Sequence, residues 1–186
     1  MNDAKCDSRG RLWAGSTHKE FVPGVGALHR WDGAGASEEI ASGFVLPNGL
    51  GWDVDDTRMY LVDSFAHSLM VAGYDGSELT GDFEPLCAIH DGLPDGLAVD
   101  TDGCVWLAVW GGWVVCRYAP TGELLGRVPM PIAQPSSCAF GPDGTLYITS
   151  ARSGLDDEQL ADQPLAGSVF ALSTAVHGVP VGALAR

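Results

Sequence analysis

The chain has 186 residues, of which 46% are hydrophobic and 18% charged, a composition typical of a folded globular protein rather than a disordered one. The 24 acidic residues outnumber the 10 basic ones and give a formal charge of −14 at pH 7, which repels nucleic-acid phosphates and anionic lipid headgroups. We therefore expect neither nucleic acid nor a membrane surface as a partner.

The beginning of the chain and its apolar runs bear on its location. No apolar signal region follows Met1, and the longest nearly apolar run, residues 104–116, is too short to span a bilayer and contains two glycines. We therefore predict a cytoplasmic protein. The five cysteines include no CxxC pair and several lie in apolar runs, so we expect them to act as small buried hydrophobic residues.

One pattern recurs four times along the chain. Each copy has a polar residue, a short apolar strand, a tight turn and a second strand that carries an aromatic residue. The aromatic anchors are 47, 46 and 41 residues apart, close to the roughly 40 to 50 residues of a propeller blade. In chain order, the anchors are Trp13, Tyr60, Trp106 and Tyr147.

Turns and further strands complete each repeat. Glycine at positions 10, 103 and 144 supplies the positive φ angle of a tight hairpin. Later strands are expected at 27–33, 69–76 and 114–118, with a weaker one at 168–172. Only residues 155–166 suggest a helical turn, which Pro164 limits. The sequence therefore predicts an all-β protein, a β-propeller with about four blades, and a single domain over residues 1–186.

A polar residue stands at the start of each first strand. Because the first strands of propeller blades line the central channel, residues at equivalent positions meet around one axis. The residues 11 or 12 positions before the anchors are Asn2, Asn48, Asp95 and Ser136. Carboxylate and amide oxygens suit one divalent metal ion such as calcium, magnesium, manganese or zinc. We predict Asn48 and Asp95 as its ligands.

A simpler interpretation of these two residues stays open. Asn48-Gly49 and Asp95-Gly96 are both dipeptides that favour turns, and either pair could serve only that purpose. Each blade, however, already has a separate hairpin turn further along. This spacing favours positions within the first strands, facing the channel.

Five stretches resemble one family in the same order and at the same spacing. They are residues 2–7 with 12–16, 47–52, 94–97, 110–112, and 137–141 with 147–152. These stretches are similar to the senescence-marker-protein, gluconolactonase and regucalcin-like family, and the match runs nearly end to end. The resemblance implies a six-bladed propeller, of which this chain lacks about two amino-terminal blades, with one divalent metal in the channel. It also implies hydrolysis of sugar lactones such as gluconolactone by metal-activated water.

The resemblance also implies roles for individual residues. Asn48 and Asp95 match two metal ligands of the family, and Asp95 also matches its acid/base residue. Asn2 and Glu20 match substrate-binding residues. The family's glutamate ligand falls in the absent blades. For Glu20 an exposed loop charge stays the alternative, and Asn2 lies at the chain end, where fraying is usual.

The incomplete ring leaves two further hypotheses. One is a noncatalytic remnant that binds a metal or another ligand. The other is an interaction scaffold, because an open arc of four blades leaves strand edges that can pair with another chain. We therefore also expect self-association through the open edges.

Overall fold

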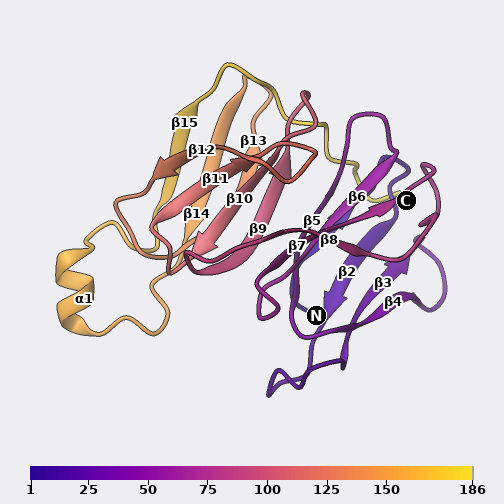
Figure 1. The fold of residues 1–186 in the computed structure, drawn as a ribbon, viewed down its shortest axis with the longest axis horizontal. Coiled ribbons are helices and arrows are strands. Elements are labelled where there is room, and N and C mark those ends of the chain that lie inside the picture. The colour runs from indigo at the N-terminus through magenta and orange to yellow at the C-terminus, as the bar shows by residue number, and fades with distance from the viewer. Residues whose placement is uncertain (186) are drawn as a thin grey trace.

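The computed structural model describes residues 1–185 and contains four antiparallel sheets arranged one after another (Figure 1). Blade 1 contains β1 (Ala4–Cys6), β2 (Leu12–Ser16), β3 (Gly26–Trp31) and β4 (Glu38–Phe44). Blade 2 contains β5 (Pro47–Trp52), β6 (Arg58–Asp63), β7 (Ser68–Gly73) and β8 (Glu84–Ala88). Blade 3 contains β9 (Leu93–Val99), β10 (Val105–Trp110), β11 (Val114–Tyr118) and β12 (Leu124–Pro129). Blade 4 has three strands, β13 (Pro135–Phe140), β14 (Thr145–Ser150) and β15 (Val169–Ser173).

The predicted fold class is confirmed. Each blade is a meander whose strands pair in chain order, and the first strands β5, β9 and β13 contact one another. The three predicted hairpin glycines, Gly10, Gly103 and Gly144, all have φ between 78° and 81°. The outer strands β4, β8 and β12 were not predicted. They are mostly exposed, so they lack the apolar alternation by which half-buried strands are recognised.

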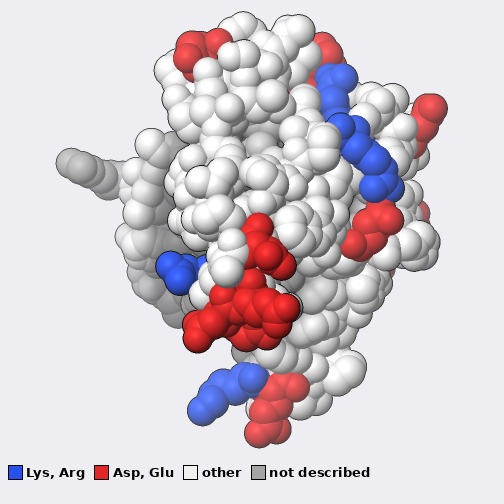
Figure 2. All heavy atoms as spheres, turned by 90° about the vertical axis from the view of Figure 1, so that its left-hand side faces the viewer, with Lys and Arg blue, Asp and Glu red and all other residues white. Residues whose placement is uncertain are grey.

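One short helix, α1 (Asp157–Asp162), lies in the β14–β15 connection, inside the range expected to be helical. It begins with a capping box in which the Asp156 carboxylate accepts a hydrogen bond from the Gln159 backbone N–H at 2.9 Å. Acidic side chains gather at this helix (Figure 2). Part of the net negative charge is therefore a solvated surface. Over residues 1–185, the structure offers no helix with the length and apolar character of a membrane span.

The hydrophobic core lies between the blades. Trp13 of blade 1 packs in a cluster with Trp52 and Met59 of blade 2, and the rings of Trp13 and Trp52 meet edge to face at 5.8 Å. Tyr60 packs in the same way on blade 3, and Trp106 on blade 4. Each of these three aromatic anchors thus covers the face of the following blade.

The fourth anchor differs from the other three. Tyr147 is 44% exposed, whereas Trp13, Tyr60 and Trp106 are buried. No blade follows blade 4 in residues 1–185, so Tyr147 has no neighbouring sheet to pack against. The repeat in the sequence predicted four equivalent anchors, but burial of the ring depends on the next blade.

A buried carboxylate stabilises the hairpins of blades 1 and 3. In blade 3, Asp100 accepts hydrogen bonds from the Trp106 indole at 2.8 Å and from the Arg117 guanidinium at 2.9 Å. Its other oxygen accepts from the Cys104 backbone N–H at 2.9 Å. Asp7 in blade 1 does the same with Trp13 and Arg11. The two charges are acceptable in the core because they are paired and hydrogen-bonded.

Glycines allow neighbouring blades to approach closely at one end. A Cβ at Gly15 would lie 2.8 Å from the Pro47 carbonyl oxygen, and one at Gly49 would lie 2.5 Å from the Asp95 carbonyl oxygen. A Cβ at Gly96 would collide with the Ser137 side chain. Glycine therefore permits each contact between blades at this end.

We expect Gly49→Ala to lower the free energy of unfolding by about 1–3 kcal/mol, because the added methyl group meets the fixed backbone of blade 3. Gly126→Ala is the matched control. It lies in β12 with open space around the added methyl, and should change stability by less than about 0.5 kcal/mol. Urea denaturation measures both values, and equal effects would contradict this account of the packing.

Candidate active site at one end of the channel

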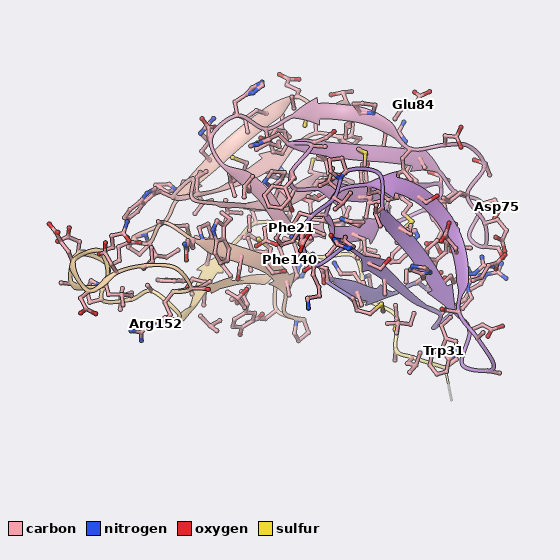
Figure 3. The ribbon with its side chains drawn as sticks, turned by 90° about the horizontal axis from the view of Figure 1, so that it is seen from below. Phe21, Trp31, Asp75, Glu84, Phe140 and Arg152 are labelled. Atoms are coloured by element: carbon pink, nitrogen blue, oxygen red, sulfur yellow. The ribbon has the colours of Figure 1, made fainter. Side chains whose placement is uncertain are left out.

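The predicted site residues lie at one end of the blades, here called the site face. In each blade the start of the first strand pairs with the end of the second, as in Pro47 with Asp63, Leu93 with Trp110, and Pro135 with Ser150. The first strands therefore begin on the same face, where the loops after β2, β6, β10 and β14 also lie. This face is at the bottom of Figure 1 and toward the viewer in Figure 3.

A β-bulge occurs at each of the three predicted positions in blades 2 to 4. Between Pro47 and Leu50 the first strand has one residue more than its partner, and the same is true between Pro94 and Leu97. In blade 4 the extra residue is Ser136. A bulge redirects side chains and is common next to active sites. The Asn-Gly and Asp-Gly pairs are therefore parts of bulged strands, and the interpretation as turns is wrong.

Asn48 and Asp95 come together on the site face. The Asn48 amide nitrogen donates a hydrogen bond to Ser64 Oγ at 3.0 Å, which leaves its oxygen available. Burial raises the pKa of the Asp95 carboxyl to about 7, and the nearby Asp3 carboxylate raises it further, whereas hydrogen bonding with Asn48 lowers it. A carboxyl with a pKa near neutrality can both accept and donate a proton at physiological pH.

Asn2 is held in place although it lies near the chain end. Its backbone N–H donates to the Gly15 carbonyl at 2.8 Å, and its side-chain amide donates to the Pro47 carbonyl at 3.0 Å. Asn2 is therefore next to Asn48 in space.

Glu20 and Ser136 are less closely connected to this centre. Glu20 is exposed in the loop between β2 and β3, and its side chain makes no hydrogen bond or ion pair with the part of the chain that the structure describes. Ser136 Oγ lies 2.8 Å from Thr149 Oγ1 of its own blade. The structure thus brings together Asn2, Asn48 and Asp95, but not the side chains of Glu20 or Ser136.

Three charged or ionisable residues near the centre were not predicted. The Lys5 ammonium crosses the channel from blade 1 and donates to the Leu97 carbonyl of blade 3 at 2.9 Å. Burial lowers the pKa of Lys5, and Asp3 opposes this effect. Burial also raises the pKa of the nearby Cys138 thiol to about 12. A lysine on a short first strand was the available signal, because lysine is rarely buried without a partner.

A cavity of about 640 Å³ occupies the opposite end of the channel. Its walls are the ends of the four first strands and the segment 177–181, which crosses this end. Lys5 lines it, whereas Asn2, Asn48 and Asp95 do not. Lys5 therefore lies between the cavity and the site face.

The raised pKa of Asp95 predicts a pH dependence of stability. An aspartate in an unfolded chain has a pKa of about 3.9, so between about pH 4 and pH 7 the folded chain binds more protons at this residue. The free energy of unfolding contributed by Asp95 should therefore fall as pH rises through this window. We expect the wild type to lose stability relative to Asp95→Asn between these pH values, measured by urea denaturation with a chelator present.

Ser136→Ala is the control for this measurement. It also changes the start of a first strand but removes no titrating group, so its difference from the wild type should stay constant with pH. A constant difference for Asp95→Asn as well would contradict the burial of the charge.

Comparisons with known proteins identify the family. A family model described as the SMP-30/Gluconolactonase/LRE-like region matches residues 1–152. The chain is 38% identical over 184 residues to an L-arabinolactonase of Azospirillum brasilense, with 96% of this chain and 61% of that protein covered. It is 34% identical over 194 residues to the regucalcin of Oryctolagus cuniculus, with 97% and 64% covered.

A solved structure agrees with these matches. A calcium-binding protein, regucalcin, from Agrobacterium tumefaciens superimposes with a TM-score of 0.88 at 29% identity, covering 99% of this chain and 64% of that one. The chain thus spans less than two thirds of the length of these relatives. With its repeated blades and the match over residues 1–152, the chain belongs to the SMP-30/gluconolactonase/LRE-like family.

Proposed function

We propose that the site face performs divalent-metal-dependent hydrolysis of sugar lactones, such as gluconolactone and related aldonolactones. The observation that carries this proposal is the convergence of the Asn48 amide and the buried Asp95 carboxyl on the site face. Relatives named L-arabinolactonase and 6-deoxy-6-sulfogluconolactonase support the substrate class. Cytoplasmic location and the single domain over residues 1–186 stay predictions.

The residues present fit a divalent cation. The Asp95 carboxylate makes no ion pair with the described residues 1–185 and its charge is poorly solvated, so a cation beside it would compensate that charge. The Asn48 amide oxygen supplies a second hard donor. No group of three or more His, Cys, Asp and Glu residues is found in the part of the chain that the structure describes. These two residues would therefore hold the ion together with water or groups from outside this chain.

When bound, a divalent ion would polarise the lactone carbonyl and lower the pKa of water. The role of Asp95 is proton transfer. We propose that its carboxylate accepts a proton from the attacking water as the water oxygen bonds to the carbonyl carbon. The ring C–O bond then breaks, and the same carboxyl returns the proton to the departing oxygen, which gives the hydroxy acid. Asn48, held by Ser64, orients the Asp95 side chain.

The substrate hydroxyls would be bound at the edge of this centre. Asn2 donates its amide N–H to Pro47, so its side-chain oxygen is available as an acceptor for a sugar hydroxyl. Glu20 is an exposed carboxylate in the β2–β3 loop on the same face and can accept from another hydroxyl. Both assignments depend on the family match rather than on contacts within this chain.

We expect the 186-residue chain to hydrolyse gluconolactone after a chelated sample is supplied with calcium, zinc or manganese. Asp95→Asn should lower kcat/KM by about 100- to 10,000-fold, because it removes the proton acceptor. A pH-indicator assay of acid release measures this. Asp82→Asn changes an exposed aspartate in the β7–β8 connection and should leave kcat/KM unchanged. Absence of any metal-dependent rate in the wild type would contradict the proposal.

A noncatalytic metal-binding function is the second candidate. It is favoured by a donor set of only two residues, Asn48 and Asp95, in the described residues 1–185. This function predicts metal binding by calorimetry without lactone turnover, with affinity abolished by Asp95→Ala and retained by Asp82→Ala. Turnover by the wild type would decide against it.

The scaffold hypothesis concerns the flanks of the arc. Tyr147 and Val169 of blade 4 leave apolar surface open to solvent, at 44% and 64% exposure. Such a flank supports self-association. Self-association stays a prediction.

A further inference from the structure

Two exposed phenylalanines meet on the site face. Phe21 lies in the β2–β3 loop of blade 1 and Phe65 in the β6–β7 loop of blade 2, and their ring centroids are 4.9 Å apart in an edge-to-face arrangement. The two side chains are still 43% and 41% exposed. Large aromatic side chains held against each other yet open to water leave an apolar surface that a ligand can cover.

This pair is directly connected to the candidate catalytic centre. Phe65 follows Ser64, whose hydroxyl accepts the hydrogen bond from the Asn48 amide at 3.0 Å. Phe21 follows Glu20 in the loop after β2. In the view onto the site face, Phe21 lies near the middle of the arc of blades rather than at its outer edge (Figure 3). The aromatic surface therefore lies at the mouth of the channel.

The backbone holds Phe21 in an uncommon conformation. Its φ is +52°, a value that residues with side chains adopt rarely. His67, in the same β6–β7 loop as Phe65, has a φ of +51°. The Thr17 hydroxyl holds the β2–β3 loop against the connection between blades 1 and 2 by donating to the Val45 carbonyl at 2.7 Å. Such conformations persist where surrounding contacts hold them, and they cluster at ligand sites.

We propose that Phe21 and Phe65 form an apolar wall of the substrate pocket that binds an apolar substituent remote from the ring carbonyl, so that the site also accepts lactones whose substituent is apolar rather than hydroxylated. This inference rests on the proposed function, because it places the lactone carbonyl at Asn48 and Asp95. An apolar substituent that reaches this wall loses its contact with water and gains contact with the rings of Phe21 and Phe65. A sugar lactone instead has Asn2 and Glu20 as acceptors for its hydroxyls, and it gains little from the two phenylalanine rings, which offer no hydrogen-bonding partner.

Binding of unreactive analogues tests the wall separately from catalysis. The probes are two lactams with the same ring size, gluconolactam and 6-pentylpiperidin-2-one, and calorimetry measures their dissociation constants on the metal-loaded chain. We expect the wild type to bind both lactams. Phe21→Ala should weaken binding of the pentyl lactam about tenfold, because apolar contact at a pocket wall is lost, and change gluconolactam binding less than about twofold.

Two further variants separate the wall from a structural role of the loop. Phe21→Leu keeps an apolar side chain and should retain most of the affinity for the pentyl lactam. Tyr147→Ala removes an equally exposed aromatic side chain from blade 4 and should change neither affinity. Thermal unfolding by circular dichroism establishes that each variant is folded, and Phe65→Ala replaces Phe21→Ala if that variant is not.

Three outcomes would overturn the proposal. They are equal weakening of both lactams in Phe21→Ala, no change in that variant, or no binding of the pentyl lactam by the wild type. The proposed function fails differently, through absence of metal-dependent lactone hydrolysis. A loss of pentyl lactam binding confined to Phe21→Ala, without turnover by the wild type, would support the wall alone. Turnover without such a loss would support the hydrolase alone.

Discussion

The close approach of neighbouring blades at the site face is the constraint on which the rest of the structure depends. Gly15, Gly49 and Gly96 each leave room for a backbone or side-chain group of the next blade. Because no Cβ separates the strands there, residues far apart in the chain become neighbours. The aromatic anchors then cover the faces of the following blades, and the hydrophobic clusters form between sheets rather than within one.

The bulges convert this packing into a site. In a regular strand, successive side chains point to opposite faces of the sheet, and the glycine after Asn48 or Asp95 would occupy one position of this pattern. The extra residue at each bulge interrupts the pattern where the strands begin. Asn48 and Asp95 thereby meet, and burial raises the pKa of the Asp95 carboxyl, a charge that a bound cation would compensate. The same packing that stabilises the arc of blades therefore also raises the pKa of the Asp95 carboxyl.

The channel has two chemically different ends. On the site face, polar residues of blades 1 to 3 converge beneath a rim that includes Phe21 and Phe65. At the other end, the segment 177–181 closes a mostly apolar cavity. Lys5 crosses between blades 1 and 3 at the boundary of these regions, with its ammonium on the Leu97 carbonyl. A ligand on the site face thus meets hydrogen-bonding groups below this aromatic rim, whereas a ligand in the cavity meets mainly apolar walls.

The sequence by itself determined the class of fold, the order of blades and the candidate residues Asn48 and Asp95. Periodic aromatic residues and hairpin glycines are local signals. They repeat because each blade needs a tight hairpin and an apolar ring to pack against the next sheet. Only the tertiary structure decided which side chains meet. The outer strands, the exposure of Tyr147, the crossing of Lys5 and the Phe21–Phe65 pair all depend on neighbouring blades. No local pattern reports such contacts, because burial and proximity are properties of the assembled arc.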